Sequence, residues 1–210
     1  MATVVERLSK SQQKEDTRRK ILESAAEVFA SKGFHGSVVD DIVRASGTSK
    51  GAVYFYFESK EQIFFSLVQD YVTTLAQQMH LAMHRGRGLV GQVEATVATL
   101  VRSFHSHPAL ARIVLLDWPN AGAEFQGKRM ALKGMLVEVL RGYLDRAVQD
   151  RRIESQDTEL AAYVWIGAIG EVVVRWLNTG RPTPLEDVIA PLTRLLLSSV
   201  GLAHAPSAAT

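Results

Sequence analysis

TRRKILESAAEVFASKGFHGSVVDDIVRASGTSKGAVYFYFESK, residues 17–60, predicts three short helices with a tight turn between the second and the third. In the first helix, apolar residues recur at helical spacing and form one stripe that faces a core: Ile21, Leu22, Ala25, Ala26 and Phe29. Asp16 or Thr17 is the expected N-cap. Gly33 is expected to end this helix, because glycine tolerates the positive φ of a C-terminal cap.

The second and third helices are expected on either side of the turn at Gly47, which can adopt a positive φ. Ser37 is the predicted N-cap of the second helix. Its core face consists of Val39, Ile42 and Val43. The third helix has only Val53 as a clear core anchor and otherwise presents small, polar and aromatic side chains. Such a helix, after a helix and a tight turn, is typical of a segment that enters the major groove of DNA.

An ordinary three-helix core with a solvated third helix is the alternative interpretation of this pattern. Residues 49–57 contain four aromatic side chains and no acidic one. A solvated helix rarely has that composition, and we therefore favour contact with DNA.

The segment GTSKGAVYFYFESK, residues 47–60, resembles the helix-turn-helix motif of the TetR family of bacterial transcriptional regulators. The resemblance covers residues 17–60 and implies an all-α fold: a three-helix DNA-binding head followed by a six-helix ligand-binding and dimerisation domain. Three positions depart from the family pattern, and two of them are Thr48 in place of valine and Tyr56 in place of histidine. Val38 also replaces the usual serine or threonine, so a phosphate contact there is expected from Ser37.

The predicted DNA-binding residues lie in and around the third helix. Base edges or a thymine methyl group are expected to meet Ser49, Lys50, Gly51, Ala52 and Phe55, with Thr48 at the turn. Phosphates are expected to meet Ser37, Tyr54, Tyr56 and Lys60.

The basic excess of the chain lies in the same region. Residues 1–60 hold ten Lys and Arg against eight Asp and Glu, whereas the remaining residues hold fourteen of each. The cluster Arg18-Arg19-Lys20, together with Lys50 and Lys60, is spaced to meet a phosphate backbone. The net charge of +2 is therefore concentrated where DNA contact is predicted.

The composition is that of a soluble, cytoplasmic protein with a large core, since 47% of the residues are apolar. The absence of cysteine excludes disulfides and thiolate sites. No signal peptide is recognisable. The longest apolar stretch, residues 160–174, contains Glu171 and is shorter than the roughly 20 residues that span a membrane, so no membrane association is expected.

Catalytic and metal-binding patterns are not found in the sequence. The histidine pairs His80/His84 and His105/His107 lack a third ligand at useful spacing. No phosphate-binding loop and no nucleophile elbow is visible. We therefore expect no metal, no cofactor and no enzymatic activity.

Beyond residue 60, helix follows helix, with stops at glycine and proline. Six further helices are expected at about residues 59–83, 89–106, 109–117, 124–150, 157–178 and 185–202, before a frayed tail at 203–210. Pro191 is expected to bend the last helix or to mark its first turns. The predicted domains are a DNA-binding domain, 1–60, with a flexible basic arm at about 1–15, and a ligand-binding and dimerisation domain, 61–210.

The last two predicted helices are apolar around most of their circumference. A domain as small as residues 61–210 cannot bury two such helices completely. The pattern therefore suggests that a partner chain covers part of the surface of these helices. The alternative is that both helices are internal core. The TetR resemblance implies a homodimer in which these two helices of each subunit form a four-helix bundle.

Aromatic side chains on the central helices mark a candidate small-molecule cavity in the second domain. The predicted walls are Phe104, Trp118, Phe125 and Trp165, and Arg175 is the predicted anchor for an anionic ligand. Each wall residue has the alternative role of packed core. Glu171 and Arg175, four residues apart, have the alternative of an intrahelical salt bridge.

These features predict a homodimeric, one-component transcriptional regulator. We expect a repressor that binds a palindromic double-stranded operator and is released by a small, mainly apolar or amphiphilic ligand. The alternative is a ligand-independent, DNA-binding architectural or interaction protein on the same scaffold. A compound that stabilises the protein and releases its DNA would support the first and exclude the second.

Overall fold

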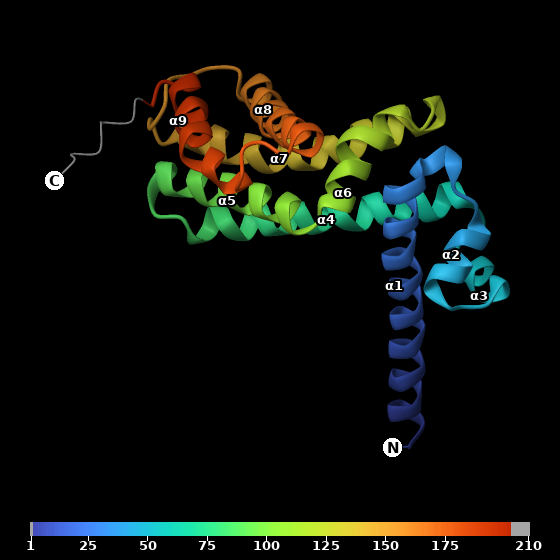
Figure 1. Ribbon diagram of the computed structural model, residues 1–210. Coiled ribbons are helices and arrows are strands. Elements are labelled where there is room, and N and C mark those ends of the chain that lie inside the picture. Colours follow the sequence, from blue (N-terminus) through green and yellow to red (C-terminus); the bar gives the residue numbers. More distant parts are fainter. Residues whose placement is uncertain (1, 203–210) are drawn as a thin grey trace. The chain divides into compact units, whose positions relative to one another are not determined.

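The computed structural model describes residues 2–202, and every regular element in that range is helical (Figure 1). The elements are α1 (Ala2–Gly36), α2 (Val39–Ser46), α3 (Lys50–Tyr56), α4 (Lys60–Arg85), α5 (Gly88–Ser106), α6 (Pro108–Arg112), η1 (Ile113–Asp117), η2 (Trp118–Asn120), η3 (Ala123–Phe125), α7 (Gln126–Gln149), α8 (Thr158–Thr179), η4 (Leu185–Val188) and α9 (Ile189–Ser199). The predicted all-α fold, three helices followed by six, is confirmed over the described range. The expected tail at 203–210 lies outside it.

The chain forms two compact units, which divide inside α4. The head unit ends at Asp70, and the body unit begins at Tyr71. α4 therefore supplies Phe64 to the core of the head unit and Leu75 to the core of the body unit. A functional boundary at residue 60, as expected from the sequence, stays a proposal.

α1 begins far upstream of the expected start. It begins at Ala2, so residues 2–15, which were expected to form a flexible arm, are helical. The Thr17 hydroxyl does not cap a helix but donates to the Gln13 carbonyl, 2.8 Å away, inside α1. The physical reason is that no glycine or proline precedes Gly33, so nothing in the sequence interrupts the helix before that point.

The core of the head unit is aromatic. Phe29 of α1 contacts Phe64 of α4 edge to face, with ring centroids 5.1 Å apart, and the Phe34 ring lies 4.7 Å from the same ring. Gly33 interrupts α1 with a φ of 71°, which lets Phe34 fold back onto Phe29. Val53 anchors α3 and has no exposed surface. These contacts fix the short helices α2 and α3 on α1 and α4.

The body unit departs from the expected helices between α6 and α7. The π-helical turn η1 replaces the end of the helix expected at 109–117, and the 3₁₀ turns η2 and η3 follow it. Pro119 and Gly122, whose φ is 139°, prevent a regular helix here. Pro191 lies in the first turn of α9, where a backbone N–H would have no intrahelical acceptor.

Candidate functional sites in the head and body units

The turn between α2 and α3 is fixed by local hydrogen bonds. Gly47 adopts the left-handed conformation, with φ 61° and ψ 24°, and ends α2. The Ser46 and Thr48 hydroxyls lie 2.7 Å apart across this turn. Ser49 Oγ accepts a hydrogen bond from the Ala52 N–H at 3.1 Å, which makes Ser49 the N-cap of α3. In the free protein, the Thr48 and Ser49 hydroxyls therefore make hydrogen bonds within the turn.

The outer face of α3 is open to solvent. Its exposed residues are Lys50, Gly51, Tyr54 and Phe55, while Ala52 and Tyr56 are half-buried. Phe55 is 69% exposed, which is unusual for a phenylalanine. An apolar side chain at this position suits contact with a thymine methyl group in a major groove.

Lys50 is held by an acid in the free protein. Its ammonium lies 2.8 Å from the carboxylate of Asp40 on α2, and this hydrogen bond raises the pKa of Lys50 above its ordinary value. Both side chains are more than half exposed, so the pair is weak and screened by salt. A base contact requires Lys50 to exchange Asp40 for an acceptor on the DNA.

Ser37 does not occupy the position expected of a phosphate contact. It is 1% exposed, and its hydroxyl donates to the Phe34 carbonyl at 2.8 Å. The N-cap of α2 is Val38, whose N–H is bound by the carboxylate of Asp41 at 3.1 Å. The predicted cap at Ser37 is therefore wrong. The burial of the hydroxyl between α1 and α2 argues against the predicted phosphate contact at Ser37.

Lys60 is also turned inward. Its ammonium donates to the carbonyl oxygens of Phe34 at 2.7 Å and of Ser37 at 2.9 Å, and it lies 4.4 Å from the centre of the Phe34 ring. These carbonyls belong to the end of α1 and to the link between α1 and α2. Lys60 thus ties the start of α4 to that link, with two of its three N–H donors occupied. The phosphate contact of Lys60 stays a prediction, and only the third N–H donor is left for it.

Asp41 is the buried charge of the head unit. Its Oδ1 accepts hydrogen bonds from the Lys32 ammonium at 2.7 Å and from the Arg44 guanidinium. The Lys32 hydrogen bond, followed by that of the Val38 N–H, holds the pKa of Asp41 below its ordinary value. These contacts form a network that ties α2 to the end of α1.

The head unit is expected to lose stability in acid through Asp41. Because the pKa of Asp41 is lower in the folded chain than its ordinary value of 3.8, its ion pairs stabilise the fold above that value. This stabilisation is lost as the pH falls through the lower, folded pKa. Asp41→Asn is expected to lower the melting temperature at neutral pH and to flatten its decline below about pH 4. Thermal unfolding followed by circular dichroism across this range is the measurement, and an unchanged decline in the variant would contradict the assignment.

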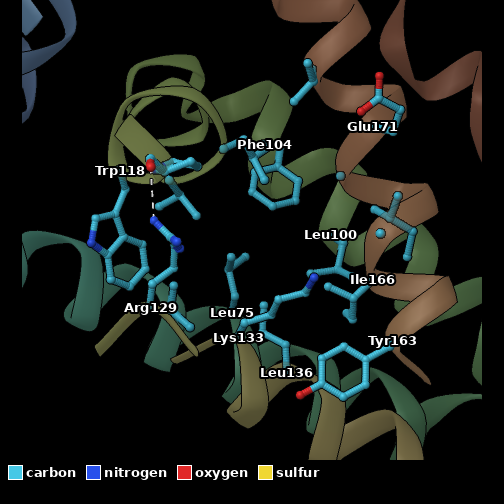
Figure 2. Close-up of a pocket in the computed structure, with 18 of the residues that line it drawn as sticks. Leu75, Leu100, Phe104, Trp118, Arg129, Lys133, Leu136, Tyr163, Ile166 and Glu171 are labelled. Carbon is cyan, nitrogen blue, oxygen red and sulfur yellow. Dashed lines mark hydrogen bonds between the residues drawn. The ribbon is translucent and has the colours of Figure 1, made fainter. Parts of the chain in front are cut away.

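The body unit contains a cavity of about 500 Å³. This volume is within the range of small-molecule sites. Side chains of α4, α5, the η1–η2 segment, α7 and α8 surround it (Figure 2). Most of its walls are apolar, with Leu75, Leu100, Leu136 and Ile166 among them. The π-helical turn beside it is a type of irregularity that is frequent at functional sites.

The structure places only some of the predicted ligand residues at this cavity. Two line it, Phe104 and Trp118, and three do not, Phe125, Trp165 and Arg175. The indole N–H of Trp165 donates to Ser199 Oγ at 3.0 Å, which holds the buried ring between α8 and α9. Phe125 is buried just before α7. Both rings therefore act as core at these positions.

Glu171 and Arg175 lie in different environments although both are on α8. Glu171 reaches the cavity, whereas Arg175, one turn later, is exposed and lies outside the lining. No ion pair joins the two side chains in the part of the chain that the structure describes. The predicted intrahelical salt bridge is therefore not formed there.

Two cations that sequence reasoning missed line the cavity from α7. Arg129 donates to the Pro119 carbonyl at 3.0 Å, the dashed line in Figure 2. The Lys133 ammonium lies 5.5 Å from the centre of the Tyr163 ring. Against these two cations, the described lining contains one carboxylate, that of Glu171. The signal in the sequence was the spacing of four residues, which places both cations on one side of a helix.

One side of α8 and α9 stays open in the single chain. Leu160 and Val164 of α8 are 60% and 52% exposed, and Leu195 of α9 is 69% exposed. Ile169 and Leu196 of the same helices are buried. Each helix therefore has an inner face in the core of the body unit and an outer apolar face.

Comparison with known proteins identifies relatives that cover most of the chain. The family described as "Bacterial regulatory proteins, tetR family" matches residues 21–67. The HTH-type transcriptional repressor AcnR of Corynebacterium efficiens is 34% identical over 175 residues, which cover 83% of this chain and 89% of that protein. The fatty acid metabolism regulator protein of Bacillus subtilis is 26% identical over 190 residues, which cover 90% of this chain and 97% of that protein.

Solved structures share the fold. The fatty acid degradation regulator FadR from Bacillus halodurans matches with a TM-score of 0.81 at 23% identity, over 85% of this chain and 97% of that one. FadR from Bacillus subtilis in complex with stearoyl-CoA also matches with a TM-score of 0.81, at 24% identity, over 89% of this chain and 99% of that one. The order of helices is thus shared across the head and body units.

Proposed function

This chain belongs to the TetR family of bacterial regulatory proteins and is a DNA-binding transcriptional regulator. We propose that it is a homodimeric repressor that binds a palindromic operator. We propose further that an anionic amphiphile with a long apolar tail releases it from the DNA. The observation that carries the ligand proposal is the mainly apolar cavity with two cations in its wall. We assign the protein to the cytoplasm, where the DNA lies, and give it no catalytic role.

The outer face of α8 and α9 supports the proposal of a dimer. Leu160, Val164 and Leu195 form an apolar surface that a second copy of the chain would cover. α8 is long and apolar enough, by length and composition alone, to cross a membrane, and we attribute that character to the subunit contact. Two-fold symmetry would then present two α3 helices to two half-sites, spaced by a whole number of DNA turns.

An amphiphilic ligand fits the chemistry of the cavity. The apolar walls favour an alkyl chain, because burial of each CH₂ group contributes about 0.8 kcal/mol. Arg129 and Lys133 offer donors to a carboxylate or a phosphate. The relative named for fatty acid metabolism and the stearoyl-CoA complex of Bacillus subtilis FadR support a ligand of the acyl type.

α4 is the element through which such a ligand would act. Val72 and Leu75 of α4 line the cavity, and Lys60 at its start binds the link between α1 and α2. A ligand that shifts α4 would therefore strain the Lys60 hydrogen bonds and move α2 and α3. The coupling required is modest, about 1–3 kcal/mol, or roughly 5–150-fold in DNA affinity.

A chain-length series of ligands tests this function. Palmitate and palmitoyl-CoA are expected to raise the melting temperature and to release a labelled duplex that the protein has selected from random DNA. Butyryl-CoA, which buries little apolar surface, is expected to do neither. DNA binding that no acyl compound changes would instead support the ligand-independent alternative.

Lys133→Glu is expected to weaken palmitate binding by roughly 10- to 100-fold, the effect of losing a hydrogen bond to a charged group and adding a like charge. Lys128→Glu is the matched control, because Lys128 is an exposed lysine of α7 outside the cavity lining. Isothermal titration of both variants is the measurement. Equal losses in the two variants would show that Lys133 makes no specific contact with the ligand.

A further inference from the structure

We propose that Lys14 and Lys20 of α1 are the lysines with which the head unit neutralises DNA phosphates on either side of α3. Lys14 lies outside every contact that the sequence predicts, and Lys20 enters those predictions only as part of a basic cluster. The inference rests on the DNA-binding function stated above, and it concerns which residues supply the phosphate contacts.

Lys14 lies beside the C-terminal end of α3. Its ammonium is 5.7 Å from the centre of the Phe55 ring, the most exposed aromatic ring of α3. α1 and α3 lie side by side in Figure 1, consistent with this contact. No acidic residue is three or four positions from Lys14 on α1, so the helix itself offers no ion pair. The charge is thus held at the edge of the surface that meets DNA.

Lys20 lies at the other end of α3, beside the turn. Its ammonium is 4.0 Å from the position that a Cβ atom would take at Gly47. Asp16 and Glu23 are within reach of Lys20 along the helix, but both bind Arg19, at 2.7 and 3.8 Å. The two lysines are six residues apart, or about 9 Å along the helix. They therefore bracket α3 from one side.

The other described cations of the head unit are already engaged. Arg18 and Arg19 bind carboxylates of α1 and α4, Lys32 and Arg44 bind Asp41, Lys50 binds Asp40, and Lys60 binds two carbonyls. Lys14 and Lys20 have no carboxylate or carbonyl partner among the described residues. A cation that must first break an ion pair gains less binding free energy from a phosphate than a cation that has only water to displace. Lys14 and Lys20 are therefore expected to gain the most binding free energy from DNA phosphates.

The salt dependence of DNA binding distinguishes a phosphate contact from a structural lysine. Each lysine that neutralises a phosphate adds about 0.9 to the slope of log K against log salt, and a dimer counts each position twice. Lys14→Gln and Lys20→Gln are each expected to reduce the slope by about 1.8 and to leave the melting temperature unchanged. Lys14→Arg, which keeps the positive charge, is expected to have the slope of the wild type. Lys60→Gln is expected to keep the slope and lower the melting temperature.

The measurement is fluorescence anisotropy of the wild-type-selected duplex over a series of KCl concentrations. Lys128→Gln is the control for loss of a positive charge from the body unit. Slopes of Lys14→Gln and Lys20→Gln equal to that of the wild type would overturn the proposal, as would a reduced slope in Lys60→Gln alone. A wild type that selects no duplex would contradict the DNA-binding function itself, which is a different failure.

Discussion

Arginine in place of Leu195 is expected to leave a folded chain that is monomeric and no longer holds its operator. Leu195 is 69% exposed in the single chain, so the monomer tolerates the change, whereas a subunit contact would bury an unpaired charge. Loss of the second head removes the avidity of two linked half-site contacts, which corresponds to roughly 100- to 10,000-fold in affinity. Sedimentation gives the mass, and anisotropy with the selected duplex gives the affinity.

The next residue along the chain provides the matched control. Leu196 is 3% exposed and faces the core of the body unit. Leu196→Arg is therefore expected to unfold that unit and give insoluble protein instead of a soluble monomer. The subunit contact would be refuted by a wild type that sediments as a monomer at tens of micromolar, or by a Leu195→Arg variant that stays dimeric.

Phe29→Ala is expected to unfold the head unit and abolish DNA binding while the body unit stays folded. The Phe29 ring has no exposed surface and contacts the rings of Phe34 and Phe64, at 6.0 and 5.1 Å. Loss of a buried phenylalanine costs about 3–5 kcal/mol, which is most of the stability of a small unit. Hydrogen exchange is expected to show rapid exchange in α2 and α3 with protection retained in α5 and α7.

Phe55→Ala is the control for this change, because it removes the same side chain from the exposed face of α3. The melting temperature is expected to stay at the wild-type value, while affinity for the selected duplex falls. A fall in melting temperature as large as that of Phe29→Ala would mean that Phe55 belongs to the core of the head unit. Protected amides in α2 and α3 of Phe29→Ala would contradict the aromatic core described above.

Much of the head unit could be predicted from the sequence. The apolar stripe of α1, the turn at Gly47 and the anchor at Val53 all lie where the pattern predicts them. Each of these features depends on residues within about four positions of one another, which is the range over which helical periodicity and capping act. The start of α1 was misplaced, because a cap residue such as Thr17 can equally bond back to a carbonyl inside a helix.

The cavity was less predictable. Aromatic residues on central helices indicate a small-molecule site, but a ring such as Trp165 fills a core as readily as it lines a cavity. Arg129 and Lys133 were missed because a charged residue on a long helix is usually solvated, and nothing within four residues distinguishes a cation that faces a cavity.

The sequence by itself determined that the regular elements of residues 2–202 are helical, that a helix-turn-helix lies near the start, and that α3 presents an outward face. These properties follow from local spacing. Tertiary structure alone decided which side chains are available for function. Lys60 is occupied by a carbonyl 26 residues away, Ser37 is buried, and Leu195 is exposed where Leu196 is not. The physical reason is that the partner of a side chain is set by which helices meet, and distant segments meet only in the folded chain.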